Sequence, residues 1–191
     1  MSSDLLIRGG TVIDGTGSPA YVADIGITGD RITGIGSINS SNFADVIDAD
    51  GLTVAPGFID AHSHSDFTLL VDPRAVSSIM QGVTAEIVGN CGYGSCPIVN
   101  QTMAREAIYG FRPDFPLTWN TVAGYFDRLE KARPAVNVLT LVPNGQLRLG
   151  TVGAKQRPAT QEELDRMKYL LRQGLEEGAY GYSTGLEYST E

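Results

Sequence analysis

The first fifty residues alternate short apolar runs with turn residues. The apolar runs are Leu5–Ile7, Thr11–Ile13, Val22–Ile27, Arg31–Ile35 and Val46–Ile47. Glycine and aspartate separate them, and Gly29-Asp30 between two alternating runs predicts a β-hairpin. We therefore expect a small β module over residues 1–52.

After residue 52 the pattern changes to strands that alternate with helices over residues 53–191. Strands are predicted at Val54–Ala61, Val83–Val88, Val136–Val142 and Ala179–Tyr182. Helices are predicted at Pro73–Gln81, after a cap at Thr118, and after a capping box at Thr160–Glu163. Long loops are predicted at Tyr93–Leu117 and between the third strand and Pro158. This order predicts an α/β protein with parallel β/α units, in a doubly wound sheet or in part of a (β/α)₈ barrel.

The second and third of these helices have apolar residues at helical spacing. The apolar positions are Val122, Tyr125, Phe126 and Leu129 in one helix, and Leu164, Met167, Leu171 and Leu175 in the other. Each helix should therefore bury one face against a core.

Composition and charge exclude several classes of protein. The 191 residues are 42% hydrophobic and 19% charged, which is ordinary for a globular protein. A formal net charge of −8 argues against a nucleic-acid surface. With neither a signal peptide nor a run long enough to cross a membrane, we expect a cytoplasmic protein without a membrane partner, and Cys91 and Cys96 should be free thiols.

The two histidines of the chain are set two positions apart, behind the strand predicted at Val54–Ala61. If this strand stays extended, His62 and His64 face the same side and supply half of a metal site. Asp60 and Asp66 lie an even number of positions from the histidines, so in an extended strand they face the same side. Such carboxylates commonly orient ligand imidazoles.

Polar residues also follow the other predicted strands. In order along the chain, the strand ends carry His62 and His64, then Cys91, then Asn144, and finally Ser183, Thr184 and Glu187. In a β/α barrel the carboxyl ends of the strands meet at one mouth, where the active site lies. The barrel interpretation therefore brings all these side chains to one place.

Three motifs together resemble the metal-dependent amidohydrolase superfamily, and within it the N-acyl-D-amino-acid deacylases (D-aminoacylases). The motifs are Pro-Gly-x-Ile-Asp-x-His-x-His at 56–64, Gly-Asn-Cys-Gly at 89–92 and Ser-Thr-Gly-Leu-x-Tyr at 183–188. The resemblance implies a β-sandwich module followed by the first half, about four β/α units, of a TIM-like (β/α)₈ barrel. It also implies hydrolysis of the amide bond of a small N-acyl amino acid by water activated by one or two Zn²⁺ ions.

The resemblance assigns roles to individual positions. Cys91 corresponds to the cysteine that binds the tighter zinc, and His62 and His64 to the weaker position of a binuclear centre. The candidates for orienting ligands or contacting substrate are Asp66, Asn144, Ser183, Thr184 and Glu187. Asn144 stands where members of the family commonly have a histidine, and an amide is a poor zinc ligand. Cys96 has no expected role.

Length limits what the chain can do alone. About 140 residues follow the β module, whereas a (β/α)₈ barrel typically needs about 250. The resemblance places the general-base aspartate beyond Glu191. We therefore expect a fragment that needs the rest of the barrel or another chain, and that has no deacylase turnover by itself.

Two alternatives remain open. The chain could derive from another amidohydrolase, such as a dihydroorotase or hydantoinase that acts on a cyclic amide. Those relatives usually bridge their metals with a carboxylated lysine, and no lysine lies near the end of the fourth predicted strand. The chain could also be a non-catalytic, truncated remnant that binds metal weakly or serves only as an interaction module.

Overall fold

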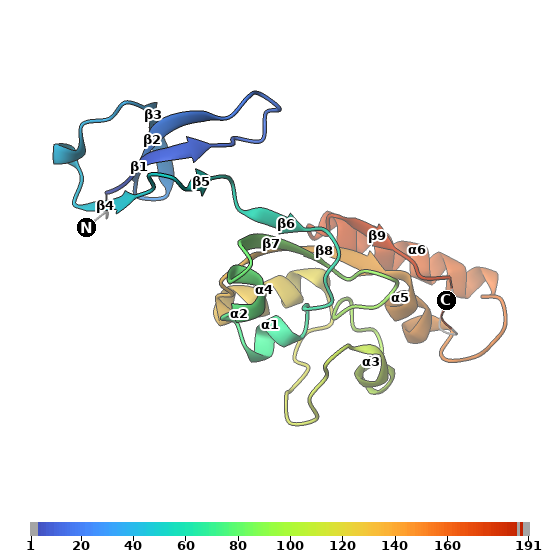
Figure 1. Ribbon diagram of the computed structural model, residues 1–191. Helices are drawn as coiled ribbons and strands as arrows, with labels where there is room; N and C mark the ends of the chain where they lie inside the picture. The colour runs from blue at the N-terminus through green and yellow to red at the C-terminus, as the bar shows by residue number, and fades with distance from the viewer. Residues whose placement is uncertain (1–3, 187, 189–191) are drawn as a thin grey trace. The chain divides into compact units, whose positions relative to one another are not determined.

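The computed structural model describes residues 4–186 and residue 188. It divides into two compact units, Met1–Pro56 and Gly57–Glu191. The boundary lies four residues beyond the change of pattern at residue 52. Figure 1 labels the elements of both units.

The first unit is built on a five-stranded sheet. Its elements are β1 (Leu5–Val12), β2 (Tyr21–Thr28), β3 (Arg31–Gly36), the short 3₁₀ helix η1 (Ser40–Asn42), β4 (Asp45–Asp48) and β5 (Thr53–Val54). Strands β1, β2 and β3 are antiparallel neighbours, whereas β4 and β5 run parallel to β1 along different parts of its length.

Two glycines explain the local shape of this sheet. The register of β1 against β2 shifts between Ile7 and Gly10, and Gly9 in between has a φ of +72°. The apolar runs on either side, predicted as separate pieces, therefore belong to one bulged strand. Gly29, with a φ of +60°, turns the chain between β2 and β3, which confirms the predicted hairpin.

The second unit contains a curled sheet of parallel strands in the order β6-β7-β8-β9 (Figure 1). The strands are β6 (Phe58–Asp60), β7 (Val83–Val88), β8 (Asn137–Pro143) and β9 (Gly181–Ser183). Each strand lies beside the next one along the chain. Parallel neighbours of this kind need crossover connections, and helices lie in those connections.

The single strand predicted at Val54–Ala61 is wrong, because the chain forms β5 and β6 in two different sheets. Pro56 between them has no N–H to donate to a ladder. Gly57 lies so close to Thr84 that a Cβ at position 57 would be 2.2 Å from the threonine side chain.

The helices of the second unit are α1 (Thr68–Val71), α2 (Val76–Ile79), α3 (Gln101–Ala107), α4 (Val122–Ala132), α5 (Asn144–Thr151) and α6 (Gln161–Glu176). Side chains from most of these helices, from β8 and from the connecting segments form one apolar core. Its buried members include Phe67, Leu70, Trp119, Tyr125, Val142, Leu147 and Leu170. The core holds the helical layer against the sheet and so fixes where the strand ends lie.

Several helix predictions need correction. The helix predicted at Pro73–Gln81 is only the four-residue α2, because Ala75 before it has a φ of +47° and interrupts helical geometry. Helix α4 is capped by Thr121 rather than Thr118, and the Thr121 hydroxyl accepts a hydrogen bond from Gly124 N–H at 3.1 Å.

Two helices lie in segments that were predicted as loops. Helix α3 begins after Asn100, whose side chain accepts hydrogen bonds from the N–H groups of Thr102 and Met103. Helix α5 begins at Asn144, directly after β8. The strand-to-helix connection at the end of β8 is therefore much tighter than expected.

The capping box that opens α6 is confirmed. Thr160 Oγ1 accepts from Glu163 N–H, and the Glu163 carboxylate accepts from Thr160 N–H. The buried face is shifted from the prediction, because Leu170 and Gly174 are buried while Leu164 and Leu175 are 38% and 43% exposed. In the described ranges, no helix combines the length and the apolar character that a membrane span requires.

Candidate metal centre

The segment with the two histidines leaves the sheet at the end of β6. Asp60 is the last residue of the strand, and its carboxylate accepts a hydrogen bond from His62 N–H at 3.0 Å. Ser63 N–H then donates to the carbonyl of Ile87 in β7 at 3.0 Å. These bonds place His62 and His64 beside the end of the neighbouring strand.

Cys91 lies in a tight turn that follows β7. Gly89, Cys91 and Gly92 have φ values of +77°, +56° and +75°. A Cβ at Gly89 would lie 2.5 Å from the carbonyl oxygen of Leu141, so only glycine fits there. The turn brings the Cys91 side chain back toward the histidine segment.

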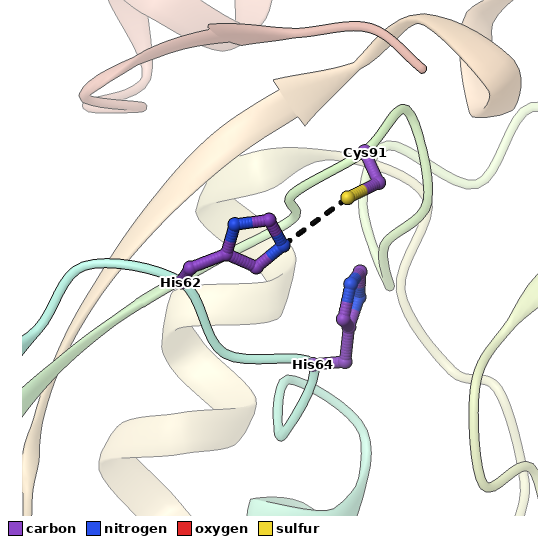
Figure 2. A group of neighbouring side chains, drawn as sticks. All are labelled: His62, His64 and Cys91. Atoms are coloured by element: carbon purple, nitrogen blue, oxygen red, sulfur yellow. Dashed lines mark hydrogen bonds between the residues drawn. The ribbon is translucent and has the colours of Figure 1, made fainter. Parts of the chain in front are cut away.

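The three side chains converge on one point. Figure 2 shows the His62 imidazole directed at the Cys91 thiol, with the His64 ring next to both. His62 Nε2 is 3.1 Å from Cys91 Sγ, and the candidate ligand atoms of His62, His64 and Cys91 all lie within 4.8 Å of one another. Two imidazoles and a thiol are a donor set that suits zinc, so the residues present fit the metal implied by the sequence.

Electrostatics favour the metal-binding form of one histidine. Partial burial of His64, and then the neighbouring His62, lower the pKa of the His64 imidazole. A lowered pKa keeps the ring neutral near pH 7, and a neutral imidazole has a lone pair for a metal.

Asp66 does not join this group, in contrast to the expectation that it shares one face with the histidines. Regular strand geometry ends at Asp60, so alternation no longer determines where later side chains point. Asp66 is 2% exposed, and its backbone carbonyl accepts a hydrogen bond from Tyr125 O–H at 2.7 Å. Burial raises the pKa of its carboxyl to about 6.

Ser183 is brought to the same end of the sheet and holds the cysteine turn. Its hydroxyl donates to the carbonyl of Gly89 and accepts from Gly92 N–H at 3.1 Å. Gly185, two residues further on, passes so close to the turn that a Cβ would lie 2.4 Å from the carbonyl oxygen of Cys91.

The remaining candidates differ in their positions. Asn144 is half-buried as the first residue of α5, directly after β8. Thr184 follows β9, between Ser183 and Gly185. Glu187 lies outside the described residues. Cys96 is 1% exposed in the core.

Sequence reasoning missed several residues around the centre. Tyr109 lies beside His64, with ring centroids 5.9 Å apart, and both border a cavity of about 510 Å³ that Tyr93, Glu106 and Tyr188 also line. Tyr109 lies in a segment predicted as a loop, where no pattern marked it. Asn90 could have been found, because it directly precedes Cys91.

A model of the amidohydrolase family matches residues 45–190. N-acyl-D-glutamate deacylase of Alcaligenes xylosoxydans xylosoxydans is similar to this chain, with 41% identity over 187 residues that cover 97% of the chain and 38% of the relative. D-aminoacylase of the same organism is 37% identical over 194 residues, again with 97% and 38% covered.

A solved structure shows a similar fold. It is N-acyl-D-glutamate deacylase from Bordetella bronchiseptica, complexed with zinc and a phosphonate inhibitor that mimics the tetrahedral intermediate of the reaction. The TM-score is 0.83 at 36% identity, with 98% of this chain and 39% of that chain covered. This chain therefore spans 38% of the length of each of the two curated relatives.

Proposed function

The chain belongs to the amidohydrolase family, and from this we propose that it carries metal ligands of an N-acyl-D-amino-acid deacylase. The enzyme would hydrolyse the amide C–N bond of N-acyl-D-amino acids to a carboxylic acid and a free D-amino acid. One observation carries the proposal, namely the convergence of His62, His64 and Cys91 at the ends of two neighbouring parallel strands. The similarity to deacylases over nearly the whole chain supports this choice of substrate class.

The proposal includes a finer description of the fold. The parallel order of β6 to β9 would be the first half of a (β/α)₈ barrel, in which the strand ends form the catalytic mouth. The first sheet would be one layer of a β-sandwich, and its exposed apolar side chains support this. Ile13, Ile32 and Ile35 are 48%, 63% and 49% exposed and line a cavity of about 340 Å³ on that sheet. We take the two compact units as the corresponding domains, with the boundary expected at residue 52 moved to Pro56 so that β5 stays with its sheet.

His62, His64 and Cys91 would hold one or two zinc ions. Zinc bound there supplies Lewis acidity toward the acyl carbonyl and lowers the pKa of a bound water. The chain's own contribution is to fix the ligands in place. Asp60 holds the start of the histidine segment, and Ser183 closes the cysteine turn.

The cavity that His64 borders is the proposed position of the substrate. Tyr93, Tyr109 and Tyr188 would supply apolar surface to an acyl group or side chain next to the ligands. In the part of the chain that the structure describes, no carboxylate joins the three ligands. This chain covers 38% of each deacylase relative, and we propose that the general base and the rest of the barrel belong to the uncovered part or to another chain.

The presence of Cys91 among the converging ligands favours a deacylase over a dihydroorotase or hydantoinase. Cys91 can act as a ligand only in its reduced form, as a thiolate, and the cytoplasmic location that we propose would keep it reduced. The assembled protein should release amino acid from N-acetyl-D-glutamate but not from its L-enantiomer, as measured by amino-acid analysis. Hydrolysis of dihydroorotate alone would instead support the cyclic-amide alternative.

The metal site can be tested directly on this chain with Co²⁺ as the probe. We expect the unchanged chain to develop a sulfur-to-cobalt charge-transfer absorption on titration with Co²⁺. Cys91→Ser should lose this absorption and bind Co²⁺ at least about tenfold more weakly. Cys96→Ser is the matched control, because Cys96 lies in the core, and it should keep both properties.

Two results would contradict the proposed site. One is an unchanged absorption in Cys91→Ser, and the other is its loss in a folded Cys96→Ser chain. Circular dichroism establishes that each variant is folded.

A further inference from the structure

The side chain of Asn90 connects the two segments that supply the metal ligands. Asn90 is 8% exposed, and its Nδ2 donates to the carbonyl of Ile87 at 2.7 Å and to the carbonyl of Ser63 at 3.2 Å. Ser63 lies between the two histidines, and Asn90 directly precedes the cysteine. One amide group therefore bonds both to the histidine segment and to the strand that leads to Cys91.

Only a group with two protons on one atom can satisfy both carbonyls. Two acceptors face the same side-chain atom, so the nitrogen of the amide, and not its oxygen, must point at them. Aspartate has nearly the same shape but would place a carboxylate oxygen against the two carbonyl oxygens. Asn90→Asp therefore replaces two attractive contacts with repulsion at almost constant volume.

The cysteine turn itself does not depend on Asn90 alone. Ser183 bonds to Gly89 and Gly92 from the other side, and glycine at both positions permits the positive φ values. What Asn90 adds is the link across to Ser63. The backbone N–H of Ser63 also donates a hydrogen bond to the Ile87 carbonyl. Ser63 is therefore held in place through both its N–H and its carbonyl.

We infer that Asn90 is a positioning residue that fastens the histidine segment to the cysteine turn and so keeps His62 Nε2 next to Cys91 Sγ. The inference rests on the proposed function, because the held geometry matters for a bound metal. Polar partners that orient metal ligands typically contribute about 10- to 100-fold in metal affinity. The link itself exists without metal and can be measured without it.

The test compares Asn90→Asp with the matched control Asn137→Asp in the full 191-residue chain. Asn137 Nδ2 also donates to a strand carbonyl, that of Thr84, at 3.0 Å, but near the start of β7, away from the ligands. Two readouts are taken, namely Co²⁺ affinity from the charge-transfer absorption and hydrogen exchange of the Ser63 amide in the metal-free chain.

We expect Asn90→Asp to weaken Co²⁺ binding by about tenfold or more and to speed exchange at Ser63 by a similar factor. Asn137→Asp should leave both the Co²⁺ affinity and the exchange rate at Ser63 close to those of the unchanged chain. If Asn90→Asp does not fold, Asn90→Ser, which leaves the carbonyls to water, should give the same two changes.

The outcomes separate this inference from the proposed function. Unchanged exchange at Ser63 in a folded Asn90 variant overturns the inference, whatever happens to Co²⁺ binding. Faster exchange together with unchanged Co²⁺ affinity also overturns it. If the unchanged chain binds no Co²⁺ but Asn90→Asp still speeds exchange at Ser63, the link stands and the proposed metal centre fails.

Discussion

Backbone conformation at one residue decides the geometry of the candidate centre. Cys91 has a φ of +56°, in the left-handed region that costs a residue with a side chain roughly 1–2 kcal/mol. The surrounding structure imposes this conformation through Gly89 and the hydrogen bonds to Ser183. A strained position that also brings a thiol to two imidazoles is a sign of function rather than of packing alone.

The two cysteines should differ strongly in reactivity. Cys91 is half-buried beside His62, whereas Cys96 is 1% exposed and burial raises the pKa of its thiol. Because the thiolate is the reactive form, iodoacetamide should modify Cys91 in the folded chain and Cys96 only after unfolding. Zn²⁺ should slow the modification of Cys91. Peptide mass spectrometry after timed quenching measures both rates.

The single variants Cys91→Ser and Cys96→Ser serve as controls for the assignment of each rate. Equal rates for the two thiols in the folded chain would contradict the burial of Cys96. A Cys91 rate that does not respond to Zn²⁺ would count against its role as a ligand.

At the scale of elements, helix α6 is supported at its start and along one face. Its first turn contains the capping box of Thr160 and Glu163, and Arg157 donates two hydrogen bonds to the Glu163 carboxylate, at 2.7 Å and 2.6 Å. Along its length, Gly174 allows close contact with the sheet, since a Cβ there would lie 2.8 Å from Val142. The helix thereby supports β8 and the strand ends beside it.

Glu163 should make the stability of the chain depend on pH. The Arg157 side chain, and then Thr160 N–H, hold the pKa of the Glu163 carboxyl at about 2, below its ordinary value of 4.5. A depressed folded-state pKa stabilises the fold above pH 4.5, and this contribution is lost as the pH falls toward 2. Glu163→Gln should therefore lower the free energy of unfolding at pH 7 but have a shrinking effect at acidic pH.

Urea unfolding of the two chains from pH 7 down to pH 3 measures the difference. Glu162→Gln is the matched control, because it removes the same charge from the same turn but leaves the ion pair between Arg157 and Glu163 intact. A difference between Glu163→Gln and Glu162→Gln that stays constant over this pH range would contradict the prediction.

At the scale of the whole molecule, the parallel sheet of the second unit has edge strands with apolar side chains. Phe58 and Ile59 of edge strand β6 are 62% and 67% exposed. An edge strand with exposed apolar residues invites pairing with another chain. This agrees with the proposal that further strands complete the barrel.

The chain by itself should therefore associate with itself. We expect Ile59→Lys to reduce the apparent mass at tens of micromolar protein, because a charge on an edge strand opposes pairing. Met80→Lys is the matched control, since Met80 is 78% exposed but lies at the end of α2 rather than on a strand. Sedimentation velocity measures the distribution, and an equal effect of both variants would contradict a role for the β6 edge.

Local sequence signals predicted those features that depend on neighbouring residues. The hairpin at Gly29 and the capping box at Thr160 and Glu163 each depend on a few adjacent positions, and both are present. Helix α3 is not predicted although Asn100 caps it, because a helix of seven residues is too short to show an apolar period. The strand predicted through Pro56 and Gly57 was wrong for a tertiary reason, since its two halves pair with different partners.

The sequence by itself predicted the candidate ligands His62, His64 and Cys91, because imidazole and thiol groups in motifs that follow predicted strands suit zinc. The tertiary structure alone decided their geometry. Regular alternation ends at Asp60, so His62 and His64 stay with Cys91 while Asp66 turns into the core. Such directions follow from long-range contacts, such as the bond from Asn90 to Ser63, which no local pattern contains.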